Sequence, residues 1–242
     1  MGYLREKYTR EYYLSRDENG HSVDYGALGA KEWESGGIFH EISDAIDLVD
    51  LKGKRVLEIG YGRGESARYM LESKDVAYYE GIDFSPAAYE LAVNTVQHCE
   101  NSKYKLFVDD IFDHFKIQKY TRSFDVVFML DVIEHIPRNE LLDLLPMIYN
   151  SLADGGYLVV DTPFYSVDED YISHGEKYIC PSPTDIHPKT IGMHCNKYTR
   201  KGLLAEIGYY GFCVSSDKVF QKKPHRAYWK LSNFIRYGKR NI

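Results

Sequence analysis

The chain has 242 residues, 44% of them hydrophobic, which suits one large α/β domain with a sizeable core. No apolar run approaches the roughly twenty residues that span a membrane. Residues 1–14 carry charges throughout, whereas a signal peptide has an apolar central region. We therefore expect a cytoplasmic protein without a membrane partner. Residues 218–242 hold eight Lys/Arg and no acid, so residues 1–217 carry 22 basic and 36 acidic side chains. This acidic excess argues against a protein that binds nucleic acid along its phosphates.

The N-terminal residues 1–50 are expected to form a cap on this domain. Tyr8, Tyr12 and Tyr13 lie at helical spacing and predict an amphipathic helix that docks on the body. The apolar positions within residues 38–49 predict a second helix, which ends before the turn at residues 51–54.

A glycine-rich run follows a short buried strand that we predict over residues 55–60. The run reads VLEIGYGRGES from Val56 to Ser66, and a helical pattern over residues 65–73 follows at once. Glycines let the backbone approach a ligand closely, and a helix start directs unpaired N–H groups towards it. The next strand, over residues 77–83, ends in Asp83. An acid at this distance can accept hydrogen bonds from both ribose hydroxyls of a nucleoside cofactor.

The glycine spacing helps to separate two classes of nucleoside cofactor. Dinucleotide-binding loops usually run G-x-G-x-x-G beneath a pyrophosphate, whereas here the run is G-x-G-x-G and Glu65 follows it. A carboxylate at the helix start repels a pyrophosphate but tolerates a ligand with an ammonium and a sulfonium. The run VLEIGYGRG, followed by the acid-ended YYEGIDFS, resembles the class I S-adenosylmethionine-dependent methyltransferases.

Strand–helix alternation along the chain indicates an α/β protein with a parallel doubly wound sheet. The resemblance implies a Rossmann-like methyltransferase fold in a single domain, with a mostly parallel seven-stranded sheet. Its parts would be the cap, a cofactor-binding core at 51–164, an insertion after strand five at 165–195, and a C-terminal part at 196–242. Ser85-Pro86 predicts a helix start, and the turn at residues 153–156 predicts a helix end. The remaining core strands are predicted over 104–109, 124–130 and 156–162, and the helices over 86–98 and 138–152.

The resemblance also implies cofactor-binding roles for residues of these motifs. The glycines would approach the amino-acid end of S-adenosylmethionine, Glu58 would support their loop, and Asp83 would hold the ribose. Phe84 would pack on the adenine, and Asp110 and Ile111 would contact the edge of its ring. If the register differs by one residue, Asp109 takes this role. Alternatively, the two acids are simply solvated at the end of the strand. The predicted cofactor-binding residues are Glu58, Gly60, Tyr61, Gly62, Gly64, Ser66, Asp83, Phe84, Ser85, Asp109, Asp110, Ile111, Leu130, Asp131 and Tyr13.

Tyr13 has two interpretations. It could simply dock its helix on the body, or its ring could close over the cofactor, since the family often covers its cofactor with the N-terminal segment. A tyrosine face suits a sulfonium through cation–π attraction.

A second specific match is the run LDVIEHIP over residues 130–137. It resembles the fourth strand and following loop of small-molecule methyltransferases, which would place Leu130 and Asp131 beside the sulfonium end of the cofactor. His135 is a candidate general base, because an imidazole that titrates near neutrality can take a hydroxyl or ammonium proton. It could equally fix the loop by a hydrogen bond. The N-P-P-[YF] tetrad of amino-methylating nucleic-acid and protein-glutamine enzymes is missing here.

The stretch after the fifth strand, residues 165–195, is expected to be a lid that shapes the acceptor pocket. Its His and Cys residues match no zinc spacing, so no metal is predicted. His194, just before a predicted N-capped helix over 201–210, is a second candidate base. A strand is predicted over 212–220. Residues 228–237 fit a basic amphipathic helix or an antiparallel strand, and the resemblance favours the strand.

The sequence therefore predicts an enzyme that uses S-adenosylmethionine to methylate a hydroxyl, carboxyl or amine of a small molecule, such as a sugar or a secondary metabolite. The expected partner is this small-molecule acceptor, with no nucleic acid. Two alternatives remain open at this point. One is an NAD(P)-dependent oxidoreductase, and the other is a non-catalytic S-adenosylmethionine-binding subunit.

Overall fold

The computed structural model describes residues 8–14, 30–166, 173–174, 196–221 and 231–239. The chain divides into two compact units, one of residues 1–119 with 186–190 and the other of residues 120–185 with 191–242. The boundary at Lys119–Tyr120 falls inside the predicted cofactor-binding core, and the single-domain organisation stays a prediction. Among the described residues, no helix has both the length and the apolar character to cross a membrane.

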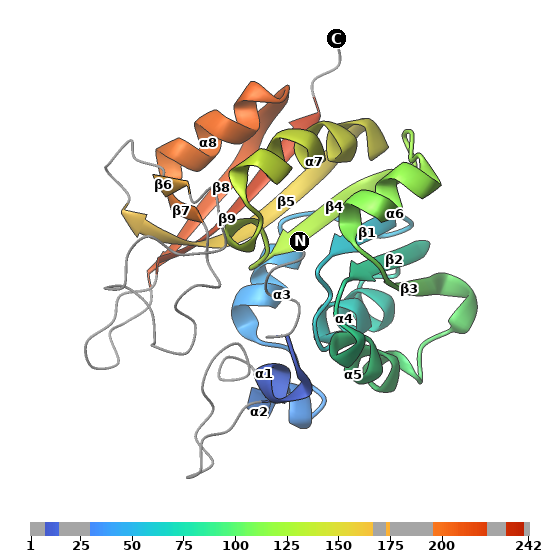
Figure 1. The fold of residues 1–242 in the computed structure, drawn as a ribbon. Coiled ribbons are helices and arrows are strands. Elements are labelled where there is room, and N and C mark those ends of the chain that lie inside the picture. Colours follow the sequence, from blue (N-terminus) through green and yellow to red (C-terminus); the bar gives the residue numbers. More distant parts are fainter. Residues whose placement is uncertain (1–7, 15–29, 167–172, 175–195, 222–230, 240–242) are drawn as a thin grey trace. The chain divides into compact units, whose positions relative to one another are not determined.

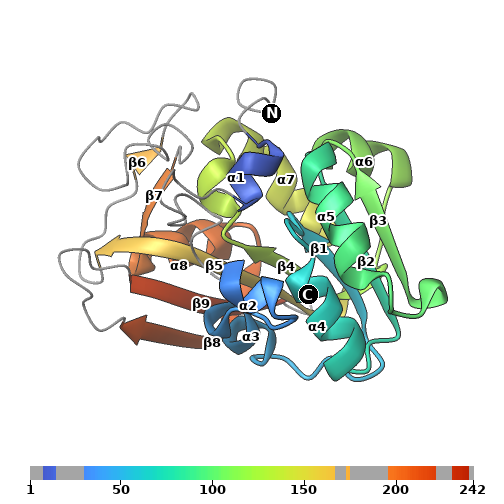
Figure 2. The ribbon, with the colours of Figure 1, turned by 90° about the horizontal axis from the view of Figure 1, so that it is seen from below.

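The first unit is built on three parallel strands with β2 between β1 and β3. Every residue of β1 and β2 after the first is buried, as expected of parallel strands that are covered on both faces. Helices α4 and α5 cover one face of these strands and α6 lies towards the other (Figures 1 and 2). The elements are α1 (Arg10–Leu14), α2 (Ala30–Glu34), α3 (His40–Ile46), β1 (Arg55–Ile59), α4 (Glu65–Ser73), β2 (Tyr78–Asp83), α5 (Pro86–Val96), η3 (Asn101–Lys103), β3 (Tyr104–Val108) and α6 (Ile111–Gln118).

The predicted start of α5 is confirmed. Ser85 is the N-cap, its hydroxyl accepts a hydrogen bond from the backbone N–H of Ala88 at 3.3 Å, and Pro86 occupies the first helical position. Helix α6 was not predicted, because its two leading acids were interpreted as a strand end that contacts the adenine. The side chain of Asp110 caps α6 by accepting from the N–H of Phe112 at 2.9 Å.

The second unit is built around β5, which pairs in parallel with β4 and with the short β7 and antiparallel with β9. Strand β8 pairs antiparallel with β9, so the strand interpretation of the last segment is confirmed, although β9 lies at 231–239 instead of 228–237. The elements are β4 (Phe124–Leu130), η4 (Ile133–His135), α7 (Arg138–Ser151), β5 (Leu152–Ser166), β6 (Ser173–His174), β7 (Asn196–Thr199), α8 (Arg200–Tyr209), β8 (Phe212–Gln221) and β9 (Leu231–Lys239).

Strand β5 begins at Leu152, four residues before its predicted start. The turn residues that end α7 are already part of the strand, as an irregular segment in which Gly155 has a φ of 75° and the register against β4 shifts between Phe124 and Val126. The α/β class with parallel strands is confirmed. The seven-strand count and the insertion stay predictions, because most of residues 165–195 lie outside the described residues.

Candidate cofactor-binding site

The glycine loop connects β1 to α4 in the first unit, as the sequence predicts. Gly64 has a φ of 81°, and a Cβ atom there would lie 2.9 Å from both Cα and Cβ of Ala92 on α5. A side chain at this position would therefore have to adopt a strained backbone and push α5 away. Glycine at position 64 allows the loop to pack directly on α5.

Asp83 is the last residue of β2, and its buried carboxylate joins two backbone segments. One oxygen accepts from the N–H of Gly62 at 3.0 Å and the other accepts from the N–H of Ser85 at 2.9 Å. Burial raises the pKa of Asp83 to about 6, against the lowering effect of these N–H groups. Since an ionised carboxylate has about four lone-pair sites, Asp83 can accept further hydrogen bonds from a ligand.

Glu58 lies beneath the loop on β1 and is also buried. Its Oε2 accepts from the hydroxyl of Ser66 at 2.9 Å and from the hydroxyl of Tyr79 at 2.5 Å. The pKa of Glu58 is raised to about 7, mainly by burial, with the two hydroxyl hydrogen bonds opposing the shift and the nearby charges of Glu65 and Asp83 adding to it. This arrangement ties β1 to α4 and β2. The predicted supporting role of Glu58 fits it, whereas Tyr79 was not foreseen.

A buried ion pair stands at the end of the glycine loop. Arg63 is 1% exposed, and its Nε and Nη2 donate to Oε1 of Glu65 at 3.1 and 2.6 Å. Arg63 also donates from Nη1 to the backbone oxygen of Tyr13 at 3.3 Å, and its guanidinium carbon lies 5.8 Å from the ring centroid of Trp33. Among the residues that the structure describes, Oε2 of the buried Glu65 has no hydrogen-bond partner. The burial of both residues was not predicted.

The N-terminal tyrosines dock on this unit through apolar and polar contacts. Tyr13 is buried in a cluster with Tyr61, Ala88 and neighbouring residues of α5. The backbone oxygen of Tyr8 accepts from the hydroxyl of Ser85 at 2.8 Å, and the Tyr8 ring lies edge-on to Phe84 with centroids 4.8 Å apart. The docking interpretation of Tyr13 thus matches its position, and its closure over the cofactor stays a prediction.

The side chain of Tyr61 is directed into the protein interior. It is buried, and its hydroxyl donates to the backbone oxygen of Phe107 at 3.0 Å. Its ring also lies 2.8 Å from where a Cβ of Gly81 would be. The side chain of Tyr61 therefore packs the loop on the sheet.

The acids after β3 have distinct partners. Asp110 caps α6, whereas Oδ2 of Asp109 lies 2.9 Å from Nδ1 of His114, whose Nε2 is 3.6 Å from Oε1 of Glu80. Burial lowers the pKa of His114, but its hydrogen bonds to Glu80 and Asp109 outweigh this effect and raise it above the ordinary value. The side chain of Ile111 is buried. His114 was not predicted, since a histidine on an amphipathic helix gives no sign of buried acidic partners.

Leu130, Asp131 and His135 belong to the second unit, whereas the other described site residues belong to the first. Leu130 is buried at the end of β4, and Asp131 has a φ of 53° and donates its N–H to the backbone oxygen of Asp161 at 2.9 Å. His135 ends the turn η4. His194, the other candidate base, lies outside the described residues.

Two unpredicted contacts fix η4. The buried Asn196 donates from Nδ2 to the backbone oxygens of Ile133 and Ile136 at 3.1 and 2.6 Å. The hydroxyl of Thr162 donates to Oε2 of Glu134 at 2.9 Å. The loop that bears His135 is therefore held by β5 and β7. Sequence spacing could not reveal Asn196, which is sixty residues further along the chain.

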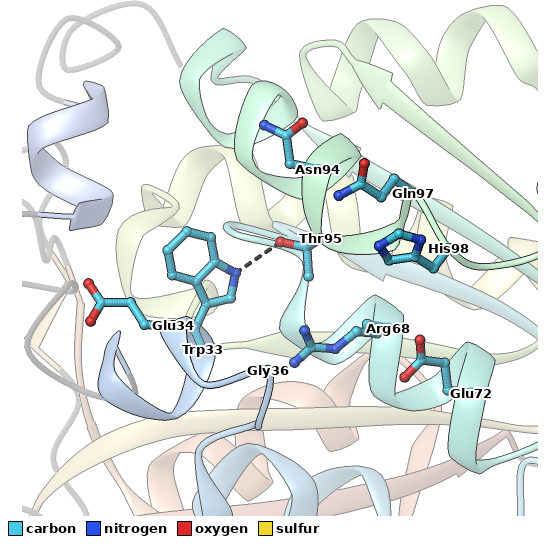
Figure 3. Close-up of a pocket in the computed structure, with 9 residues that line it drawn as sticks. All are labelled: Trp33, Glu34, Gly36, Arg68, Glu72, Asn94, Thr95, Gln97 and His98. Carbon is cyan, nitrogen blue, oxygen red and sulfur yellow. Dashed lines mark hydrogen bonds between the residues drawn. The ribbon is translucent and has the colours of Figure 1, made fainter.

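A pocket in the first unit lies among α2, α4 and α5 and includes none of the predicted site residues (Figure 3). The indole N–H of Trp33 donates to the hydroxyl of Thr95 at 2.9 Å along its wall, and Arg68 donates from Nη2 to the backbone oxygen of Gly37 at 2.6 Å. Its lining residues are Trp33, Glu34, Gly36, Arg68, Glu72, Asn94, Thr95, Gln97 and His98.

Comparisons with known proteins agree on one family. A family model described as a methyltransferase domain matches residues 33–216. A tRNA U34 carboxymethyltransferase of Helicobacter hepaticus is 26% identical over 187 residues, which cover 76% of this chain and 55% of the relative. A ubiquinone biosynthesis O-methyltransferase of Neisseria meningitidis is 29% identical over 133 residues, which cover 50% of this chain and 52% of the relative. The chain thus spans about half the length of these curated relatives.

The solved structures show that the fold is shared. The 1,6-didemethyltoxoflavin-N1-methyltransferase of Burkholderia thailandensis, solved with bound 1,6-didemethyltoxoflavin and S-adenosylhomocysteine, superposes with a TM-score of 0.65 at 13% identity. The match covers 98% of this chain and 88% of that chain. The family match covers most of the chain, including the glycine loop and Asp83. The chain therefore belongs to the methyltransferase domain family, within the class I S-adenosylmethionine-dependent methyltransferases.

Proposed function

We propose that this chain transfers the methyl group of S-adenosylmethionine to a hydroxyl, carboxyl or amine of a small molecule. The observation that carries the proposal is the connection of the glycine loop to the buried carboxylate of Asp83, through the N–H of Gly62. This connection brings together the two motifs on which the resemblance depends. Membership of the family speaks against the nicotinamide-dependent alternative.

The residues present fit this cofactor. When bound, it supplies a reactive methyl group on a sulfonium. The chain's own contribution is to bind and align, which can supply about 7–11 kcal/mol of the barrier reduction. In our proposal the backbone of Gly60, Gly62 and Gly64 meets the amino-acid end and Asp83 accepts from the ribose. The predicted adenine contacts are Phe84, Asp110 and Ile111, and the predicted contacts at the methyl end are Leu130 and Asp131.

We propose His135 as the group that removes a proton from the acceptor. The contacts of Asn196 and Glu134 hold its turn in place, which favours a base with a fixed position. A base helps only where the acceptor has a high pKa, as a sugar hydroxyl does. From the sequence, His194 is an equal candidate. Replacing each histidine separately by Gln tests the two candidates. The base is the histidine whose replacement lowers kcat and leaves cofactor affinity unchanged.

Charge and sequence similarity favour different classes of acceptor. The acidic balance of residues 1–217 supports a small molecule over a polyanion. A second candidate is methyl transfer to tRNA, which the Helicobacter hepaticus relative, named as a carboxymethyltransferase of tRNA U34, favours because its match covers 76% of this chain. Nucleic acid therefore stays a candidate partner, contrary to the expectation from charge alone.

Calorimetric titration with S-adenosylhomocysteine, and with NAD in parallel, tests the cofactor proposal. We expect micromolar binding of S-adenosylhomocysteine alone. Absence of that binding would overturn the proposed function. Transfer from S-adenosylmethionine labelled in its methyl group, to a panel of hydroxyl, carboxyl and amine compounds and to bulk tRNA, then tests the acceptor class. Binding without transfer to any acceptor would favour the non-catalytic cofactor-binding subunit.

A further inference from the structure

Glu65 has a buried carboxylate of which only one oxygen accepts hydrogen bonds from described residues. It is the first residue of α4, is 5% exposed, and offers Oε1 to two nitrogens of Arg63. Its Oε2 has no hydrogen-bond partner in the described part of the chain. A buried oxygen of an ionised group is costly to leave without a donor. The position therefore suits a ligand that brings a donor, preferably a charged one.

The surroundings of Glu65 are rich in negative charge. Glu58 and Asp83 are buried around the same loop, and the charges of Glu65 and Asp83 both raise the pKa of Glu58, after the larger effect of burial. Arg63 balances Glu65 within the pair. A cationic group that entered beside Glu65 would reduce the mutual repulsion of these carboxylates.

The start of α4 adds a complementary feature. Gly64 is the N-cap and offers no side chain to the first N–H groups of the helix. Such groups attract a carboxylate, and the adjacent Glu65 attracts a cation. An α-amino acid carries both charges on one carbon atom. The end of the loop is therefore matched to the zwitterionic part of a ligand.

We propose that Oε2 of Glu65 accepts a hydrogen bond from the α-ammonium group of the cofactor and so selects ligands with an intact amino-acid end. The inference rests on the proposed function, since it concerns the same site. Arg63 acts as a positioning residue, because its contacts with Tyr13 and Trp33 hold the guanidinium that orients Glu65.

Binding calorimetry with two ligands tests this inference without any turnover. The ligands are S-adenosylhomocysteine and its analogue in which hydrogen replaces the α-amino group. For the unmodified chain we expect the analogue to bind at least about tenfold more weakly, the loss typical of a charge-assisted hydrogen bond. For E65Q we expect S-adenosylhomocysteine to weaken by a similar factor and the two ligands to bind within about threefold of each other.

The control is E72Q, the same substitution at an exposed position of the same helix. We expect E72Q to discriminate between the two ligands as the unmodified chain does. The glutamine oxygen of E65Q can still accept from Arg63, and a thermal melt without ligand reports whether the variant is folded.

The outcomes separate the two proposals. Equal binding of both ligands to the unmodified chain would overturn the inference and leave the cofactor proposal intact, whether or not E65Q folds. Persistent discrimination by folded E65Q would overturn it as well, because the ammonium would then be recognised elsewhere. Failure of the unmodified chain to bind S-adenosylhomocysteine would overturn the proposed function and the inference with it.

Discussion

Asp83 combines burial, two backbone hydrogen bonds and a pKa of about 6. A protonated carboxyl loses acceptor capacity, so ribose hydroxyls should bind best to the ionised form. Binding then lowers the pKa of Asp83 and releases protons near pH 6. We expect the affinity for S-adenosylhomocysteine to rise with pH between about 5 and 7. Titrations in two buffers of different ionisation enthalpy measure the protons released.

The control for this prediction is D83N, whose amide cannot ionise. We expect weaker binding by about 1.5–3 kcal/mol, the contribution of a hydrogen bond to a charged group, and no rise in affinity between the same pH values. A pH profile of D83N that matches the unmodified chain would assign the proton to another group, with Glu58 as the first to examine because its pKa is also raised, to about 7.

The behaviour of single residues could be predicted from sequence only where a motif fixes the side chain's surroundings. Asp83 follows a buried strand and a glycine loop, so its place at the site was foreseeable. Arg63 was not foreseeable, because a charged residue in a loop is solvated by default. Its partners, the backbone of Tyr13 and the ring of Trp33, come from segments fifty and thirty residues upstream, and no local pattern connects them to the loop.

The loop and α5 pack through Gly64, which allows a matched comparison with Gly53. Both glycines have positive φ, 81° and 66°, but a Cβ at Gly53 would meet nothing within 4 Å. We expect G53A to lower the free energy of unfolding by about 1–2 kcal/mol, the cost of the left-handed backbone. G64A should lose about 1–3 kcal/mol more from overpacking against Ala92. Urea denaturation of both variants measures the difference, and equal losses would contradict the packing argument.

Helix α6 is joined to β2 and to the loop after β3 by His114, which faces Asp109 and Glu80. Its pKa is raised above 6.5 in the folded chain. The ionic part of its contribution is therefore fully present below the unfolded pKa and lost as pH rises through the folded pKa. We expect H114Q to be less stable than the unmodified chain, with a difference that is largest below the ordinary pKa of histidine, about 6.5, and that shrinks as pH rises above it.

Urea denaturation at several pH values measures this difference, with H98Q as the control at an exposed histidine. We expect H98Q to follow the unmodified chain throughout. A stability difference for H114Q that stayed constant across the range would show that His114 contributes by packing against Phe107 and not by ionic hydrogen bonding.

Elements with clear end signals could be predicted to within a few residues. Helix α4 was foreseen at 65–73 and α7 at 138–152, because a glycine loop, prolines and a helix-ending turn surround them. Helix α6 was missed because Asp110, which caps it, was interpreted as a ligand contact. The early start of β5 could not be foreseen either, since Gly155 and Gly156 read as a turn and pairing with β4 makes them part of a strand.

At the scale of the molecule, the α/β class was predictable from strand–helix alternation, but the division into two units was not. Helix α6 ends at Gln118, its C-cap residue Lys119 has a φ of 50°, and Tyr120 begins the second unit. The residues around this boundary contain neither glycine nor proline, so the sequence carries no linker signal there. The distribution of charge, by contrast, is known from the sequence alone, and it predicts how strongly the chain binds tRNA.

Charge distribution separates the two acceptor classes. Residues 1–217 carry an excess of acidic side chains, which repels a polyanion, whereas Lys222, Lys223 and Arg226 belong to the basic C-terminal stretch and lie outside the described residues. Under the small-molecule proposal we expect only non-specific tRNA binding, with a Kd of about 10⁻⁴–10⁻⁶ M at physiological salt. Fluorescence anisotropy with labelled bulk tRNA at 50 and 200 mM salt measures it.

Replacing these three basic residues by Gln should weaken this binding and lower the slope of log affinity against log salt by up to about 3, because each phosphate contact contributes about one unit. Cofactor affinity should not change, which provides the internal control. A Kd below about 10⁻⁷ M at 200 mM salt, preserved in the triple variant, would exceed what non-specific attraction supplies. The small-molecule proposal would then give way to tRNA modification, since binding of that strength requires a dedicated surface despite the acidic balance of residues 1–217.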